Sequence, residues 1–347
     1  MIKAGVIGAT GYAGSELVRI LHNHPQVSLD CVTSRSYKGK KYSDVYENYR
    51  HNENIILEDE NIEKMSLDLD VIFLALPHGE ASVRINENIL KNTKIIDLGA
   101  DFRLHKLNTY ESWYNVKHNC PEILKEAVYG LCELHRNEIK NARIIANPGC
   151  YTTCSILSLY PLVKEGLIET DSIIIDAKSG VTGAGRTVNI NNIYCEVNES
   201  IKAYKIASHR HTPEIEQELS EASCCDIVLN FTPHLVPMNR GIISTCYANI
   251  IKNAEYDDIL KAYEKYYSNE YFIRLTKNDI FPETKWVKGS NFCDIGFKID
   301  KRTNRIIVVG AIDNLVKGAA GQAVQNMNIL FGFDEREGLD NISAFPI

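Results

Sequence analysis

Short apolar runs alternate with stretches of helical periodicity through the first half of the chain. Residues 15–23 place Leu17, Val18 and Leu21 on one helical face and Pro25 ends the pattern, so we predict a helix between two strands. Strands that alternate with helices are typical of a parallel sheet in an α/β domain. The strands that this pattern predicts are 3–7, 27–33, 71–76, 94–97 and 143–146.

After Pro148 the pattern changes to longer strands with few helices between them. This change indicates a second, α+β domain with a mixed or antiparallel sheet. A last amphipathic helix over 317–330 is expected to pack back on the first domain. In this half we predict strands at 172–177, 226–233, 241–251 and 305–311, and helices at 152–163, 211–222 and 256–267.

The length of 347 residues agrees with two domains, at about 150 residues for each. We predict a first domain over 1–147, completed by 313–347, and a second domain over 148–312. With 38 basic and 45 acidic residues the net charge is −7, and the scattered cations argue against a nucleic-acid partner. The apolar runs are too short to cross a bilayer, and the amino terminus enters a strand with no room for a signal peptide. We therefore expect a cytoplasmic protein with no membrane contact.

Three glycines follow the first predicted strand, in the segment Gly8-Ala9-Thr10-Gly11-Tyr12-Ala13-Gly14. Their G-x-x-G-x-x-G spacing differs from the usual G-x-G-x-x-G, but the context of strand, loop, helix and strand favours a dinucleotide site over a simple tight turn. Glycines let the backbone approach a pyrophosphate, whose charge is stabilised by the start of the helix. The residues predicted to bind the cofactor here are Gly8, Thr10, Gly11, Tyr12, Ala13 and Gly14.

The end of the second predicted strand favours NADP over NAD. An NAD site usually carries an acid there for the ribose 2′-hydroxyl, whereas this chain has Ser34 and Arg35, with three lysines close behind. Asp30 is the alternative acid, but it lies in mid-strand, and the lysines would also suit a solvated loop. Pro77, after the third strand of the predicted sheet, is expected to face the cofactor as well.

Cys150 stands apart from the other nine cysteines. The ten are spread along the chain without a C-x-x-C pair, so the sequence has neither a zinc ribbon nor a thioredoxin motif and predicts no metal site; Cys224 and Cys225 suggest no role. Cys150 follows a strand and a Pro-Gly turn at the start of a predicted helix, where the helix field favours the reactive thiolate. Cys154, one turn further on, suits a buried structural cysteine. We predict that Cys150 is a catalytic nucleophile.

A thiolate beside a nicotinamide cofactor indicates interconversion of an aldehyde and an acyl derivative, through a thiohemiacetal and a thioester. This chemistry needs an acid/base, and histidine is the usual group near neutral pH. The segment 209–214 supplies His209 and His211 just before a predicted helix, with Glu214 available to orient a ring or bind substrate. Either imidazole fits the role, and a surface pair that caps the helix is the alternative.

Three further segments carry residues suited to binding anions or the cofactor. In the second glycine-rich loop, 178–186, Ser179 and the backbone around Gly183 could hold an anion or the nicotinamide ribose. Arg103, after a predicted strand, offers a planar donor for a carboxylate or phosphate. These two segments could instead be simple turns. Asn314, near the last helix, could bond the nicotinamide carboxamide.

Six motifs together resemble the N-acetyl-gamma-glutamyl-phosphate reductase family, type 1, and they run in order over essentially the whole chain. The motifs are 8–14 (GATGYAG), 98–103 (LGADFR), 147–151 (NPGCY), 209–214 (HRHTPE), 233–241 (PHLVPMNRG) and 313–320 (DNLVKGAA). The resemblance implies a Rossmann-type NADP-binding domain followed by an α+β substrate and dimerisation domain of the glyceraldehyde-3-phosphate dehydrogenase-like kind.

The resemblance also implies an activity: NADPH-dependent reduction of N-acetyl-glutamyl 5-phosphate to N-acetyl-glutamate 5-semialdehyde with release of phosphate, the third step of arginine biosynthesis. A cytoplasmic homodimer or homotetramer is implied as well. On this sequence Cys150 would attack the acyl phosphate and His211 would be the acid/base, with His209 still possible. The implied substrate-binding residues are Arg103, Ser179, His209, Glu214 and Arg240.

Related proteins share parts of this pattern. Aspartate-semialdehyde dehydrogenase has the glycine loop, the thiol and the final Asn-Leu-Val-Lys-Gly segment, but the paired histidines fit the family of the acetylated substrate better. The reductase of carrier-linked 2-aminoadipyl phosphate in lysine synthesis has the same reacting end. A non-catalytic redox sensor that binds NADP(H), and in which Cys150 becomes oxidised instead of acylated, would have no use for His211 or Arg103.

Overall fold

The computed structural model describes residues 1–52, 54–251 and 253–344, which divide into two compact units. Unit 1 contains Met1–Pro148 and Ala319–Asp340, and unit 2 contains Gly149–Gly318 and the residues from Asn341. The segments 313–318 and 341–344, which we predicted with the first domain, lie in unit 2. No helix in the described residues is long and apolar enough to span a membrane.

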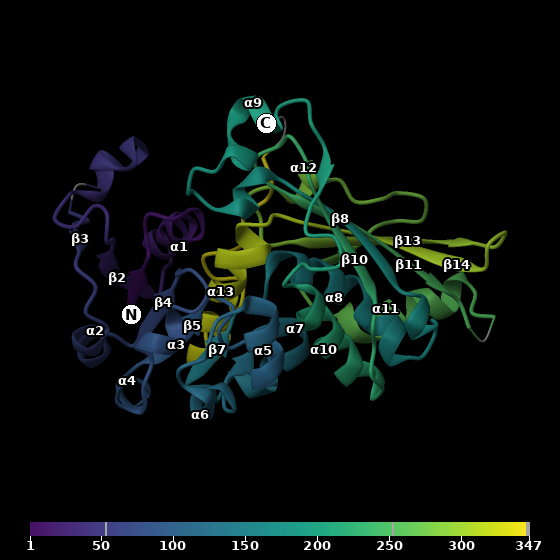
Figure 1. Ribbon diagram of the computed structural model, residues 1–347, viewed down its shortest axis with the longest axis horizontal. Helices are drawn as coiled ribbons and strands as arrows, with labels where there is room; N and C mark the ends of the chain where they lie inside the picture. The colour runs from purple at the N-terminus through teal and green to yellow at the C-terminus, as the bar shows by residue number, and fades with distance from the viewer. Residues whose placement is uncertain (53, 252, 345–347) are drawn as a thin grey trace. The chain divides into compact units, whose positions relative to one another are not determined.

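Unit 1 is built on a seven-stranded sheet in the order β3-β2-β1-β4-β5-β7-β6, and every pairing is parallel (Figure 1). The central strand β4 is fully buried along its length, as expected for a parallel sheet covered on both faces. The strands are β1 Ile2–Ile7, β2 Val27–Thr33, β3 Leu57–Glu58, β4 Val71–Leu74, β5 Lys94–Asp97, β6 Val128–Tyr129 and β7 Ile144–Ala146.

The strand order of unit 1 reverses between β1 and β4, and the crevice at such a switch point is where ligands bind in doubly wound sheets. The last helix, α13, packs on α7 and α1, and a π-helical turn at Val316–Ala320 precedes it. The helices of unit 1 are α1 Tyr12–His22, α2 Ile62–Asp68, α3 Ala81–Arg84, α4 Glu87–Asn92, α5 Leu107–Tyr114, α6 Pro121–Leu124, α7 Cys132–Ile139 and α13 Gly321–Phe331.

Unit 2 is built on a seven-stranded mixed sheet in the order β12-β13-β14-β11-β8-β10-β9. The pairs β8–β10 and β12–β13 are parallel and the other pairs are antiparallel. The strands are β8 Ile174–Ser179, β9 Lys202–Ala203, β10 Asn230–Leu235, β11 Ile242–Asn249, β12 Ile273–Leu275, β13 Cys293–Asp300 and β14 Arg305–Ile312.

The helix α8 (Cys150–Lys164) forms the centre of unit 2. It is buried without a break from Tyr151 to Leu159 and packs on β11, β14 and two other helices, α10 and α11. Figure 1 shows these three helices on the same side of the mixed sheet. The other helices of this unit are α9 Tyr194–Val197, α10 Thr212–Ser223, α11 Tyr256–Tyr267 and α12 Thr284–Val287.

Candidate active site

The glycine-rich loop between β1 and α1 has no room for side chains at two of its glycines. Gly8 has φ +83°, and a Cβ there would lie 2.4 Å from the carbonyl oxygen of Ala75. A Cβ on Gly14 would lie 2.2 Å from the carbonyl oxygen of Gly8. Gly11 is the N-cap of α1, which begins at residue 12 rather than at the predicted 15, so the first-turn N–H groups that follow it lack acceptors within the helix.

Side chains from two later segments hold this loop in place. The Thr10 hydroxyl lies 2.9 Å from the hydroxyl of Ser34, which is buried at the end of β2. The Tyr42 hydroxyl donates to the Ala9 carbonyl at 3.1 Å, and the Tyr46 hydroxyl donates to the Thr10 carbonyl at 3.0 Å. These tyrosines, which the sequence analysis missed, lie after β2, Tyr42 at the start of one short 3-10 turn and Tyr46 as the N-cap of the next, where no glycine signature marks them.

The other predicted cofactor residues of unit 1 follow neighbouring strands. Arg35 comes directly after Ser34, and its guanidinium pairs with Glu80 at 3.0 Å and with Glu60 at 3.5 Å. Pro77 lies in the loop after β4, where the N–H of Gly79 donates to a carboxylate at 2.6 Å. The predicted cofactor residues of this unit therefore gather at the carboxyl ends of β1, β2 and β4.

Arg103, the last residue of the 98–103 motif, is buried in unit 1. Its Nη2 donates to the Leu98 carbonyl at 2.8 Å. Two fully buried carboxyls lie in the same motif region, Asp97 and Asp101. Burial and the negative charge of Asp101 raise the pKa of Asp97 to about 7, and the positive charge of Arg103 opposes that shift. Arg103 thus offsets part of the cost of burying these carboxyls.

Cys150 is the first residue of α8, and a buried carboxylate fixes the helix end that carries it. The N–H of Gly149 donates to Glu214 Oε1 at 2.8 Å, and the Thr152 hydroxyl lies 2.9 Å from the same oxygen. Glu214 is only 1% exposed, so it acts here as a cap of α8. On the other side, a Cβ on Gly318 would lie 2.7 Å from the Cβ of Cys150.

The two predicted acid/base histidines lie together just before α10. Their ring centroids are 4.8 Å apart, and the backbone N–H of His211 donates to His209 Nδ1 at 3.1 Å. Burial, together with the positive charges of Lys205 and Arg210, lowers the pKa of His209 to about 3. His209 is therefore neutral near pH 7, with its proton on Nε2 because Nδ1 accepts a hydrogen bond.

Aromatic rings enclose His209 and reach toward the nucleophile. The rings of Tyr151, Tyr204 and Phe231 contact the His209 ring edge to face, with centroids 5.3–5.6 Å away. The Tyr204 hydroxyl donates to the Tyr151 hydroxyl at 3.3 Å. Burial, with a smaller contribution from Cys150, raises the pKa of Tyr204 to about 12. The sequence did not single out either tyrosine, because tyrosines distant in the chain carry no spacing signal.

Asn314 clamps the second glycine-rich loop in unit 2. Its Nδ2 donates to the Thr182 hydroxyl at 3.0 Å, and its Oδ1 accepts the N–H of Gly241 at 2.8 Å. Gly183 lies in the same loop, where a Cβ would be 3.2 Å from the hydroxyl of buried Ser179. The Asn314 amide thus uses one hydrogen of Nδ2 and one lone pair of Oδ1 within the protein. Its predicted contact with the nicotinamide would use the other Nδ2 hydrogen or the other Oδ1 lone pair.

Arg240 lies beside a fully buried carboxylate that the sequence analysis passed over. Its Nη1 is 3.6 Å from Asp313 Oδ2, and the N–H groups of Gly289 and Leu315 donate to Asp313 at 2.7 and 2.8 Å. Asp313 therefore connects the segment before α13 to the loop before β13. Its place next to Asn314 in a motif was the available signal.

The predicted site residues fall into two sets, one in each unit. The structure brings Cys150, Glu214, His209 and His211 together around the start of α8. In unit 1 the set is Gly8, Thr10, Gly11, Tyr12, Ala13, Gly14, Ser34, Arg35, Pro77 and Arg103; in unit 2 it is Cys150, Ser179, Gly183, His209, His211, Glu214, Arg240 and Asn314. In the described part of the chain, no group of three or more His, Cys, Asp or Glu side chains is placed to hold a metal ion.

Comparison with protein families assigns both parts of the chain to one group of enzymes. Residues 3–142 match the family described as "Semialdehyde dehydrogenase, NAD binding domain". Residues 150–314 match the family described as "Semialdehyde dehydrogenase, dimerisation domain". The α/β fold predicted from the sequence, a Rossmann-type domain followed by a dimerisation domain, is confirmed.

Curated relatives decide the family within this group. An N-acetyl-gamma-glutamyl-phosphate reductase from Lachnoclostridium phytofermentans is 57% identical over 346 residues, which cover 100% of both chains. The Campylobacter jejuni protein of the same name is 58% identical over 338 residues, 97% of this chain and 98% of its own. The chain belongs to the N-acetyl-gamma-glutamyl-phosphate reductase family. The resemblance predicted from six motifs is therefore confirmed.

Solved structures of another semialdehyde dehydrogenase share the fold of this reductase family member. Aspartate semialdehyde dehydrogenase with NADP from Candida albicans has a TM-score of 0.70 at 17% identity, and covers 95% of this chain and 98% of that one. Aspartate semialdehyde dehydrogenase II complexed with ASA from Vibrio cholerae has a TM-score of 0.70 at 18% identity, over 96% and 98%. At this identity the likeness shows the fold alone.

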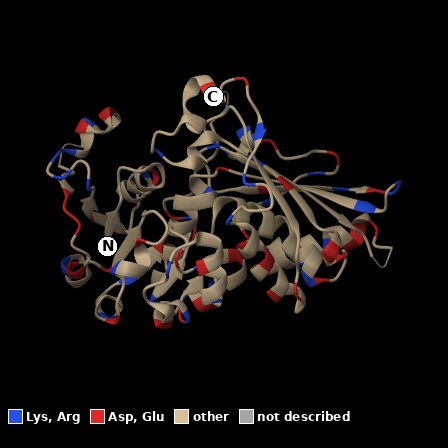
Figure 2. Ribbon diagram, viewed as in Figure 1, with Lys and Arg blue, Asp and Glu red and all other residues tan. Residues whose placement is uncertain are grey.

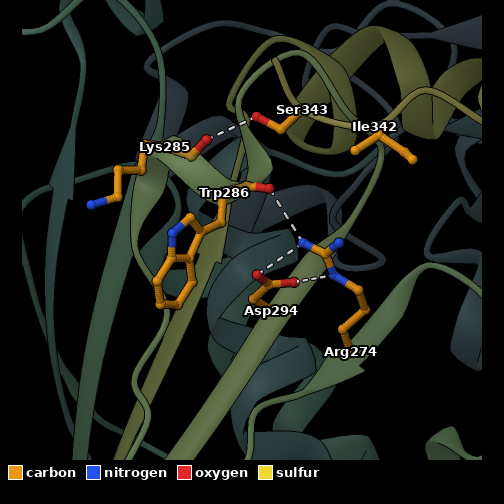
Figure 3. A pocket seen from close by; sticks show the side chains of 6 residues that line it. All are labelled: Arg274, Lys285, Trp286, Asp294, Ile342 and Ser343. Carbon is orange, nitrogen blue, oxygen red and sulfur yellow. Dashed lines mark hydrogen bonds and ion pairs between the residues drawn. The ribbon is translucent and has the colours of Figure 1, made fainter. Parts of the chain in front are cut away.

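The six residues that line a pocket in unit 2 include none of the predicted site residues (Figure 3). Arg274 crosses it and donates to both Asp294 oxygens at 2.6 and 2.9 Å, with its guanidinium stacked 4.2 Å above the Phe292 ring. The Ser343 hydroxyl donates to the Lys285 carbonyl at 2.8 Å. The positive charge of Arg274 is already paired with the carboxylate of Asp294. We therefore interpret these contacts as structural: they hold β12 against β13 at the edge of the sheet.

Proposed function

We propose that this chain reduces N-acetyl-glutamyl 5-phosphate to N-acetyl-glutamate 5-semialdehyde, with NADPH as reductant and phosphate as the second product, in arginine biosynthesis. Support comes from relatives of that name at 52–58% identity over at least 97% of the chain. The observation that carries the proposal is the thiol of Cys150 at the first residue of a buried helix, because the ring of the next residue, Tyr151, contacts the rings of both His209 and His211, with centroids 5.6 and 5.9 Å away. A homodimer or homotetramer in the cytoplasm fits such a biosynthetic enzyme.

The glycine loop of unit 1 fits a dinucleotide. Side chains are excluded at Gly8 and Gly14, so the backbone is open to a pyrophosphate beside the unpaired first-turn N–H groups of α1. Ser34 stands where NAD sites usually carry an acid, which leaves room for a 2′-phosphate near Arg35. The α1 loop, Ser34, Arg35 and Pro77 would hold the cofactor in this unit, and Gly183 and Asn314 stay its predicted contacts in unit 2. When bound, NADPH supplies the hydride that reduces the thioester.

Cys150 begins the reaction as a nucleophile. Its thiolate forms a C–S bond with the acyl carbon, the C–O bond to phosphate breaks, and phosphate leaves with that electron pair. The N–H groups at the start of α8 would stabilise the negative charge that develops on the acyl oxygen. Glu214 holds the Gly149 N–H and the Thr152 hydroxyl, so it keeps the start of the helix in one geometry.

His211 is the proposed acid/base. It first protonates the oxygen of the reduced adduct and then removes that proton as the C–S bond breaks, which releases the aldehyde and restores the thiolate. The low pKa of His209 makes it a poor proton donor near pH 7, so His209 is proposed as a positioning residue whose Nδ1 holds the His211 backbone. Arg103, Ser179 and Arg240 remain proposed contacts for the substrate carboxylate or phosphate.

The test measures the reverse reaction of the purified protein. NADP⁺ reduction is followed with and without phosphate on N-acetyl-glutamate semialdehyde, aspartate semialdehyde and the carrier-linked 2-aminoadipate semialdehyde, beside the Cys150→Ser variant. Phosphate-dependent turnover of the acetylated glutamate substrate alone, lost in the variant, is expected. Preference for either other substrate, or full activity of Cys150→Ser, would refute the proposal.

A further inference from the structure

Two arginines and two glutamates form a closed set of ion pairs in unit 1, here termed the Arg35 cluster: Arg35, Arg84, Glu60 and Glu80. The Arg35 guanidinium lies 3.0 Å from Glu80 Oε2 and 3.5 Å from Glu60 Oε2. Arg84 pairs with the same two carboxylates, at 2.7 Å from Glu80 Oε2 and in close contact with Glu60. Two positive and two negative charges therefore cancel within the cluster.

The loop after β4 fixes where the Glu80 carboxylate stands. On either side of Glu80, the N–H groups of Gly79 and Ser82 donate to the buried Asp101 carboxylate at 2.6 and 2.9 Å. Arg84 also donates to the Glu80 carbonyl. Because both flanking amides are anchored to a buried carboxylate, the Glu80 side chain is presented to Arg35 from a held backbone.

Lys38, one of the three lysines that follow Arg35, is also paired with a carboxylate. Lys38 lies 2.5 Å from Asp59, and the hydrogen bond from Lys38 holds the pKa of Asp59 below its usual range. Figure 2 shows acidic positions beside basic ones in this part of unit 1. The sequence argument for NADP used the positive charge of Arg35 and of the lysines behind it, whereas the fold brings carboxylates to Arg35 and Lys38.

We propose that Glu80 is a specificity-determining residue that weakens binding of the cofactor 2′-phosphate at Arg35. The inference rests on the proposed use of NADPH. A phosphate held by Arg35 shares one guanidinium with the Glu80 carboxylate, and two anions on one cation repel each other. A guanidinium has five N–H donors, so Arg35 can contact both groups, but the repulsion acts only on a nucleotide that carries a 2′-phosphate. NADH has no 2′-phosphate, so Glu80 lowers the ratio of NADPH affinity to NADH affinity.

The experiment measures nucleotide binding to the full-length protein by fluorescence titration. The probes are NADPH and NADH, with 2′,5′-ADP and 5′-AMP as competitors that lack nicotinamide. Glu80→Gln is expected to tighten NADPH and 2′,5′-ADP by about three- to tenfold and to leave NADH and 5′-AMP unchanged. Glu122→Gln is the matched control, because it removes an exposed carboxylate of unit 1 that pairs with Lys125 on another part of the surface, and it leaves all four affinities unchanged.

A second variant separates repulsion from orientation of the arginine. Arg35→Ala is expected to weaken NADPH but not NADH, and Glu80→Gln has no further effect in that background. An unchanged or smaller ratio of NADPH to NADH affinity in Glu80→Gln would overturn the inference, since Glu80 would then only orient Arg35. A wild-type protein that binds neither nucleotide would instead overturn the proposed function itself.

Discussion

Gly318 approaches Cys150 so closely that a methyl group on it would stand 2.7 Å from the Cys150 Cβ. The approach is built by the π-helical turn at Val316–Ala320 and by the bond from the Gly318 N–H to the Asp313 carbonyl at 2.9 Å. The carbon that carries the proposed nucleophile is thus confined on one side by a backbone, while the Glu214 carboxylate fixes the start of its helix.

Replacing Gly318 with alanine should displace Cys150. We expect the added methyl to cost about 1–3 kcal/mol in folding stability and to lower turnover at least about tenfold. The rate of Cys150 alkylation, resolved by peptide mass spectrometry, and kcat are the measurements. Gly296→Ala is the control, since its methyl would meet Thr276 Oγ1 at 2.4 Å in the same unit, and none of its closest contacts lies on α8. Equal effects on alkylation in both variants would contradict a specific hold on the thiol.

Removing the Glu214 carboxylate should loosen the start of α8. In Glu214→Ala the buried N–H of Gly149 and the Thr152 hydroxyl lose an acceptor, so we expect a loss of about 2–3 kcal/mol in the free energy of unfolding by urea. Glu214→Gln keeps one acceptor oxygen and should recover part of the loss. A Gln variant no more stable than the Ala variant would argue against the capping role.

His209 should make folding stability depend on pH. Its pKa of about 3 in the folded protein lies below the usual value of 6.5, so the unfolded chain binds more protons and stability falls as the pH drops from about 6.5 towards 3. The fall approaches about 1.4 kcal/mol per pH unit in this window. His209→Asn keeps an acceptor for the His211 N–H and should flatten the slope. Burial also lowers the pKa values of His24 and His118, so both residues add to the slope in either protein. The quantity to measure is therefore the difference in slope between the wild-type protein and His209→Asn.

Replacing Asp101 with asparagine should weaken the backbone contacts that hold the loop after β4. Asn at this position keeps one acceptor but turns the other oxygen into a donor, which would face one of the two N–H groups, from Gly79 or Ser82, that the two Asp101 oxygens now accept. We expect a loss of about 1–3 kcal/mol in stability and faster hydrogen exchange of the Gly79 and Ser82 amides. Exchange that rises equally at amides far from this loop would point to general destabilisation instead.

Local patterns were enough to predict several elements of the fold. The bounds of β2, β5 and α11 agree with the predicted ranges 27–33, 94–97 and 256–267, because each has a clear apolar period and a clear end. The strand β13 was missed although its sequence CDIGFKID alternates apolar with polar or small residues, and the burial of all of its first five residues between β12 and β14 comes from the fold rather than from that pattern.

The site was predictable only where its residues are close together in the chain. Motif context placed Cys150 at a helix start and the glycines at a strand end, and the structure has both there. The carboxylates that contact the site residues come from distant parts of the chain. Glu80 is 45 positions from Arg35, and Glu214 is 65 positions from Gly149. Spacing carries no information about such contacts, because the fold alone brings these carboxylates to their partners.

The burial of α8 links the reactivity of the thiol to the packing of unit 2. Cys150 is the half-buried first residue of a helix whose next residues are enclosed without a break, so the position of the proposed nucleophile depends on the packing of the surrounding core. Substitutions at the fully buried Leu157 or Leu159 would change the catalytic rate before they unfold the protein. Sequence change in this core is thus constrained by catalysis as well as by stability.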